Sequence, residues 1–155
     1  MGKGIIGNLG GLSNIVSGLA GNLSEMNKDS VKSEYGKYLL DNEEVVQAYS
    51  LIRDLVIFTN IRVIIIDKQG ATGKKMSVNS VFLMNIVDCS METAGTGIDD
   101  SEINITFLTN IKRNAHNQTI STYKLEFPKK MDITPLYTWL FKLAYKNRLE
   151  INEVE

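Results

Sequence analysis

Two short apolar runs near the middle of the chain, Leu55 to Phe58 and Val63 to Ile66, are rich in β-branched residues and only four residues apart. This spacing predicts a tight antiparallel hairpin. Neither run alternates with polar residues, so apolar side chains point to both faces of the hairpin. One face fits the inside of a small barrel or sandwich. The other face needs cover from a helix of the same chain or from a neighbouring subunit.

Charged residues and glycines border this hairpin. Arg53 and Asp54 precede it, and their adjacency in sequence favours a structural ion pair. Gly70 and Gly73 follow it and supply the backbone freedom that the next turn needs. If one chain leaves a face of the hairpin open, six of its side chains are candidates for an interface between copies. These are Leu55, Ile57, Val63, Ile64, Ile65 and Ile66.

The rest of the apolar pattern predicts a mainly β chain that ends in a helix. Alternation, β-branched residues and turn residues predict seven antiparallel strands, at 43–49, 51–59, 62–67, 75–84, 86–93, 102–108 and 120–127. A charged segment from Asn27 predicts a helix, capped by Asp29 or Ser30, that covers one face of the hairpin. The last segment, 132–149, has a helical apolar period and predicts an amphipathic helix with Asp132 as its cap.

Residues 1–24 differ from the rest of the chain, since they combine many glycines with apolar residues at helical spacing and carry one charge, Lys3. Such a segment can order on a membrane surface or a partner. It can equally be an extension that packs on its own domain or on a sister subunit. A secretory signal fits less well, because Gly and Asn dilute the apolar run.

Composition and charge remove several classes of function. The net charge is -1, which argues against nucleic-acid binding, and no apolar run approaches the length of a membrane span. Cys89 and His116 are the only residues of their types, so one chain offers neither a disulfide nor a Cys/His zinc site. No nucleophile with an activating base and no metal set is evident, which predicts no enzyme activity, no metal and no cofactor. We expect a cytoplasmic protein.

The hairpin motif and its flanks resemble the bacterial pleckstrin homology (PH) domain proteins. The resemblance covers residues 21 to 145 and rests on GNLSE at 21–25, LIRDLVIFTNIRVIIIDKQGATGKK at 51–75, METAGTG at 91–97, and the acidic residues Asp100 and Glu102. It implies an α+β, mainly β, PH-like fold, a seven-stranded antiparallel barrel or sandwich capped by a C-terminal helix, with an N-terminal helical extension. Trp139 of that helix would pack into one end of the barrel. The resemblance further implies no known enzyme activity and assembly into ring-shaped oligomers.

These observations predict three parts: an N-terminal segment and helix (1–42), a PH-like domain (43–150) and a short tail (151–155). The function we expect is a scaffold that forms homo-oligomers and binds a protein or peptide. The alternative is a peripheral membrane module, at the inner face of the membrane, that uses residues 1–24 and basic loop doublets to bind anionic lipid. The six basic candidates are Lys74, Lys75, Lys112, Arg113, Lys129 and Lys130, and they make one patch only if the loops converge.

Overall fold

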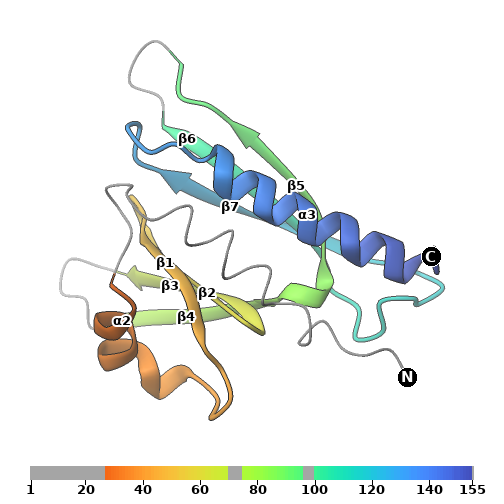
Figure 1. Cartoon of the computed structure of the whole chain (residues 1–155), viewed down its shortest axis with the longest axis horizontal. Helices are drawn as coiled ribbons and strands as arrows, with labels where there is room; N and C mark the ends of the chain where they lie inside the picture. The colour runs from red at the N-terminus through yellow and green to blue at the C-terminus, as the bar shows by residue number, and fades with distance from the viewer. Residues whose placement is uncertain (1–26, 70–74, 96–99, 155) are drawn as a thin grey trace. The chain divides into compact units, whose positions relative to one another are not determined.

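The computed structural model describes residues 27–69, 75–95 and 100–154. It divides the chain into two compact units, with the boundary between Ser80 and Val81. The strands of the described residues form one four-stranded and one three-stranded sheet, rather than a single closed barrel (Figure 1). The N-terminal segment 1–24, Gly70, Gly73 and Lys74 lie outside the described residues, and so do the predictions made for them.

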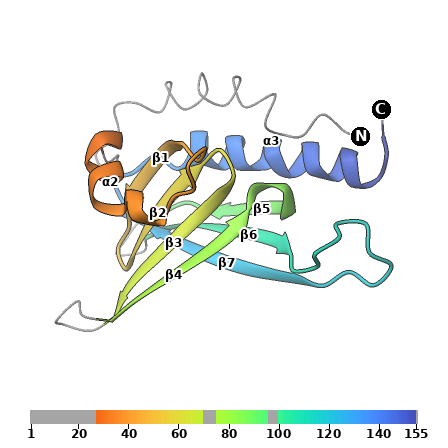
Figure 2. The same ribbon diagram turned by 90° about the horizontal axis from the view of Figure 1, so that it is seen from below.

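The first unit combines a short helix with the four-stranded sheet. Its strands are arranged in the order β1-β2-β3-β4 (Figure 2). Its elements are α2 (Lys28–Tyr35), η2 (Gly36–Tyr38), β1 (Val45–Ser50), β2 (Asp54–Thr59), β3 (Arg62–Gln69) and β4 (Lys75–Phe82). Strand β4 is therefore one edge of the sheet, and its last two residues belong to the second unit.

The predicted hairpin is β2 and β3, which pair antiparallel with Leu55 opposite Ile66 and Phe58 opposite Val63. One face of this hairpin is covered from within the chain, as predicted. Two helical side chains, Val31 and Tyr35, join a buried cluster with five strand residues, and Tyr38, Leu39 and Val45 pack against it. The strand members of the cluster are Ala48, Leu55, Ile57, Ile64 and Ile66. Helix α2 is short, and burial of this apolar stripe stabilises it more than its own propensity does.

The second unit packs one long helix on the three-stranded sheet, in the order β5-β6-β7. Helix α3 lies along this sheet (Figure 1). It buries one face, including Leu136, Trp139, Leu140 and Leu143, while Pro135 in its first turn supplies a φ angle that suits a helix start. The elements are η3 (Leu83–Asn85), β5 (Ile86–Glu92), β6 (Ser101–Leu108), β7 (Ile120–Phe127) and α3 (Thr134–Ile151).

Several details differ from the sequence prediction. The cap of the first helix is Asn27, whose side chain accepts a hydrogen bond from the backbone N–H of Asp29 at 2.8 Å, so the prediction of Asp29 or Ser30 was wrong. The fourth strand was predicted to run to Met84, but it ends at Phe82, where the 3-10 turn η3 begins. The N-cap of α3 is Ile133, so the prediction of Asp132 as cap was wrong by one residue, although the Asp132 carboxylate accepts a hydrogen bond from the Thr134 N–H at 3.1 Å.

Candidate binding site

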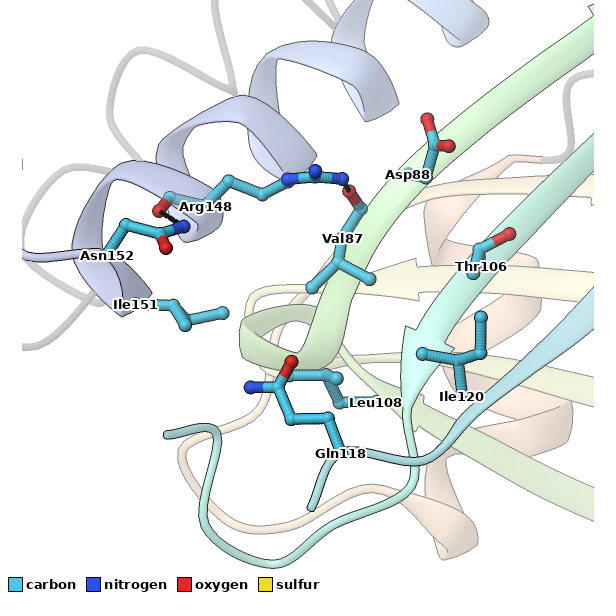
Figure 3. Close-up of a pocket in the computed structure, with 9 residues that line it drawn as sticks. All are labelled: Val87, Asp88, Thr106, Leu108, Gln118, Ile120, Arg148, Ile151 and Asn152. Atoms are coloured by element: carbon cyan, nitrogen blue, oxygen red, sulfur yellow. Dashed lines mark hydrogen bonds between the residues drawn. The ribbon is translucent and has the colours of Figure 1, made fainter. Parts of the chain in front are cut away.

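A surface pocket of about 350 Å³ lies in the second unit, between the C-terminal end of α3 and the sheet (Figure 3). Its apolar lining comes from all three strand regions and from the last turn of α3, and its polar lining forms a rim. The apolar residues are Val87, Leu108, Ile120 and Ile151, and the polar residues are Asp88, Thr106, Gln118, Arg148 and Asn152. An apolar floor with a few polar groups around it is typical of ligand sites.

A β-bulge shapes the wall of the pocket that β5 provides. The register of β5 against β6 shifts between Ile86 and Asp88, so Val87 is an extra residue without a direct partner on β6. The carbonyl of Val87 accepts a hydrogen bond from the Arg148 guanidinium at 3.3 Å. The bulge therefore gives Arg148 an acceptor that holds the guanidinium at the rim, as Figure 3 shows.

The rim keeps unused polar groups. Arg148 has no carboxylate within ion-pair distance in the part of the chain that the structure describes, and its guanidinium donates to the Val87 carbonyl. The amide nitrogens of Gln118 and Asn152 donate to the backbone carbonyls of Arg113 and Arg148, at 2.6 and 2.8 Å. Their amide oxygens are left as acceptors at the rim. The pocket thus offers one cation and two neutral acceptors above an apolar floor.

A hydrogen-bonded lock holds the loop 109–119 against α3 and so fixes the other wall of the pocket. Arg113 forms an ion pair with Glu150 at 3.0 Å and donates to the Met84 carbonyl at 3.0 Å. It also donates to the side-chain oxygen of Asn147 at 3.3 Å. Asn147 is fully buried, and its amide nitrogen donates to the carbonyls of Leu83 and Ile86 at 2.7 and 2.8 Å. The Asn147 side chain of α3 thus joins the helix to the loop 109–119 and to the segment that runs from η3 into β5.

The buried ionisable groups elsewhere have structural explanations. Burial alone would raise the pKa of Glu43, but hydrogen bonds from Arg62, Thr59 and the Leu40 N–H outweigh it and lower that pKa. The same pairing raises the pKa of Arg62. Burial, with a smaller effect of Asp88, raises the pKa of Cys89 to about 12. The Cys89 thiol is therefore protonated at neutral pH, which fits a packing role rather than that of a nucleophile.

The hairpin candidates for an oligomer interface lie in the interior of the single chain. All six, Leu55, Ile57, Val63, Ile64, Ile65 and Ile66, are at most 7% exposed. Four of them face the cluster under α2. Apolar residues on both faces of a strand indicate that both faces are covered, but not whether a second chain covers them. An interface between copies therefore has to use other side chains.

The basic doublets of the second unit do not converge. Lys112 and Arg113 precede β7, whereas Lys129 and Lys130 follow it, so an eight-residue strand of about 25 Å separates the two pairs. Arg113 is also committed to the lock with Glu150. Lys75 begins β4 in the first unit and is exposed. Of the two interpretations left open for these doublets, one joint patch or separate surface charges, the strand order favours separate charges, because β7 lies between Lys112–Arg113 and Lys129–Lys130.

Other predicted site residues are placed as follows. Trp139 is 1% exposed on the inward face of α3, which agrees with its structural role. Asp54 begins β2 and Arg53 stands exposed just before it, while their ion pair stays a prediction. His116 is exposed in the loop 109–119. Within the described ranges, no group of three or more His, Cys, Asp or Glu could hold a metal, and no helix is long and apolar enough to cross a membrane.

Sequence reasoning missed the pocket. One signal was present, because Arg148, Ile151 and Asn152 lie at i, i+3 and i+4 and must share a face of the helix. The opposite wall could not be found in this way, since Gln118 comes from the loop 109–119, whose path is not set by local periodicity, and Ile120 from the start of β7.

The fold and this helix-on-sheet arrangement agree with comparisons against known proteins. A family model described as bacterial PH domain matches residues 14–144. The chain belongs to the bacterial PH domain family. It is 43% identical over 90 residues to the uncharacterized protein YjqA of Bacillus subtilis, an alignment that covers 58% of this chain and 72% of that one.

Solved structures of bacterial PH domain proteins are similar to this chain as well. A protein with a pleckstrin-homology domain from Shewanella loihica is 34% identical, with a TM-score of 0.59, and the match covers 81% of this chain and 99% of that one. A pleckstrin homology domain from Shewanella amazonensis is also 34% identical, with a TM-score of 0.59 and coverage of 83% and 97%. The predicted family and the PH-like fold are therefore confirmed. In general terms this fold supports a binding module.

Proposed function

We propose that this bacterial PH domain protein is a non-enzymatic binding module that assembles with copies of itself and binds a protein partner. The observation that carries the self-assembly is a row of exposed apolar side chains on the edge strand β4. Met76 and Val78 are each 37% exposed, and Phe82 at the end of the strand is 49% exposed. Ser77 and Asn79 belong to the other face of the strand, and Ser80 lies on the same face as the row, between Val78 and Phe82.

The row lies on the sheet face that α2 covers only in part. Arg62 of β3 donates a hydrogen bond to the Ser80 hydroxyl at 2.8 Å, which puts both side chains on one face. Alternation along β3 places Ile64 on this face too, under α2. The same alternation along β4 places Met76 and Val78 there. Helix α2 covers the middle of this sheet face and leaves its edge at β4 exposed to solvent.

An apolar row on an edge strand is a ready surface for a second chain. The edge strand of a sheet presents backbone groups that can pair, and natural proteins usually blunt such strands with charges. Beyond Lys75 at its start, β4 carries no charged residue. A second copy that covers Met76 and Val78 would remove apolar surface from water and complete the shielding of this face. We therefore propose that the interface between copies lies on β4 and not on the buried hairpin of β2 and β3.

Light scattering on the full-length chain tests this proposal. We expect a discrete mass at a multiple of 17.3 kDa at micromolar concentration. The double change Met76→Ser with Val78→Ser should shift the mass toward the monomer. The matched control is Asn79→Ser on the opposite face of the same strand, which should keep the wild-type mass. A monomeric wild type, or an unchanged assembly in the double variant, would contradict the proposal.

The pocket in the second unit carries the other half of the proposal. The pocket is accessible from the surface, and Ile120, one of its apolar lining residues, is 64% exposed. Ile111 in the adjoining loop is fully exposed. Exposed apolar side chains grouped beside a pocket are typical of protein interaction sites. The membrane alternative receives less support, because the second unit separates its basic doublets.

A further inference from the structure

We propose that the pocket between α3 and the β5–β6–β7 sheet binds an acidic peptide segment, with an Asp or Glu of the peptide on Arg148 and a neighbouring aliphatic side chain on the apolar floor. This inference rests on the proposed protein-binding function and names the chemistry of the partner. It assigns a specific role to Arg148 that its place near the end of the helix does not require.

Charge is the first argument. Arg62 and Arg113 are each paired with a carboxylate, Glu43 and Glu150, whereas Arg148 donates to a backbone carbonyl at 3.3 Å and has no carboxylate partner among the described residues. A guanidinium retains several N–H groups after one such bond, arranged to receive a carboxylate side by side. The arginine at the pocket is thus held in place and still lacks an anion.

The surrounding charges restrict where that anion can bind. Asp88 is the carboxylate of the pocket lining, and its Oδ1 already accepts the Cys89 N–H at 2.8 Å. Figure 3 shows Asp88 on the β5 side of the Arg148 guanidinium, away from Ile151 and Gln118. An anionic ligand is repelled by Asp88 and attracted by Arg148. Its carboxylate therefore belongs on the helix side of the rim, above the apolar floor.

The neutral groups argue for a peptide rather than a free carboxylic acid. The amide oxygens of Gln118 and Asn152 remain as acceptors, while their nitrogens are used by backbone carbonyls. A peptide backbone brings the N–H donors that these oxygens need, and a simple carboxylate does not. Ile120, which lines the pocket, is itself 64% exposed. An extended chain that lies across the pocket can cover its exposed surface, whereas a small molecule held within about 350 Å³ leaves part of it in water.

A display experiment with the full-length chain identifies the ligand chemistry. The probe is a library of random twelve-residue peptides, selected on the wild-type protein and, separately, on Arg148→Gln. We expect the wild-type protein to enrich peptides in which Asp or Glu lies beside an aliphatic residue, and Arg148→Gln to lose that enrichment. Failure to enrich any peptide, or enrichment without an acidic residue, would overturn the inference.

Affinity measurements on one selected peptide separate the charge from the fold. Arg148→Gln should weaken binding about tenfold or more, and Arg148→Lys should restore part of it. Lys142→Gln removes the same charge from an exposed position of α3 outside the pocket and should change the affinity less than twofold. A peptide with Gln in place of its acid should bind wild type and Arg148→Gln equally weakly. Equal affinity of wild type and Arg148→Gln for the acidic peptide would refute the role of Arg148.

The outcomes also separate this inference from the proposed function. If the library yields only acid-free peptides and Ile120→Thr weakens them, the pocket binds protein and the acidic assignment alone is wrong. If peptides bind but neither Ile120→Thr nor Arg148→Gln affects them, the pocket is not their site. The oligomer test on β4 does not depend on either result, because it measures mass and uses residues of the other unit.

Discussion

The lock around Asn147 gives the most direct test of how the pocket wall is built. Replacing Asn147 by Leu keeps a side chain of similar size but removes the amide nitrogen that donates to the Leu83 and Ile86 carbonyls. The two buried hydrogen bonds cost about 1 kcal/mol each when lost, and the desolvation of an orphaned carbonyl adds about 1 kcal/mol. The third lost bond, in which Arg113 donates to the Asn147 side-chain oxygen at 3.3 Å, adds little, because Arg113 keeps Glu150 and the Met84 carbonyl. Leu83 keeps a second donor, the Ile86 N–H, which limits its share. We expect a loss of about 2–3 kcal/mol in the free energy of unfolding.

Urea denaturation followed by circular dichroism measures this loss. For a slope of about 2 kcal/mol per molar, the midpoint should fall by about 1–1.5 M without a change in slope. The control is Asn152→Leu, whose amide nitrogen also donates to a carbonyl, that of Arg148, but from an exposed position. It should cost less than about 1 kcal/mol, because water can replace an exposed donor. If Asn147→Leu stays within about 0.5 kcal/mol of wild type, the lock does not stabilise the second unit as described.

Three further results are expected. Glu43→Gln should destabilise the chain by about 3 kcal/mol, because it leaves the Arg62 guanidinium beside a neutral group. Since the pKa of Glu43 is lowered in the folded protein, the stability difference between wild type and variant should be full above about pH 4.5 and should shrink as the pH falls through the folded pKa. Urea titrations at several acid pH values would show or exclude this trend. Cys89, with a pKa of about 12, should resist a thiol-reactive disulfide reagent at pH 8 in the native protein and react promptly in urea, and fast native labelling would contradict its burial. Replacing Lys129 and Lys130 by Gln should change flotation with phosphatidylserine vesicles less than twofold. A large drop in flotation would instead support a lipid-binding role for these lysines.

Local pattern was enough to predict most of the fold. The last strand was predicted at 120–127 and lies there, because alternation and Pro128 define both its ends. The hairpin was also placed correctly, because two uninterrupted apolar runs lie on either side of a short polar turn. Its side chains were nevertheless offered as an interface, and they are buried. A run of apolar residues indicates how much surface must be covered, and carries no information on which segment covers it.

The candidate site was harder to predict, because it depends on contacts between distant segments. Arg148 and Val87 are 61 positions apart, and a bulge that no local pattern signals makes the carbonyl available. The separation of Lys112 from Lys129 could have been deduced, since one lies before the last strand and the other after it. The exposure of Met76 could not, because alternation predicts that a face is apolar but not that the covering helix stops short of it.

The loop 109–119 closes on itself at its base, which has a consequence for how relatives of this protein can diverge. Thr109 and Thr119 are joined through both backbone and side chains, and Asn110 bonds the Asn117 carbonyl and the Thr119 N–H. The tip around His116 is thereby isolated from the strands that it connects. Residues there can be replaced or inserted without moving β6 or β7. Natural variation, or a grafted sequence, could therefore change what surrounds the pocket while its floor stays as it is.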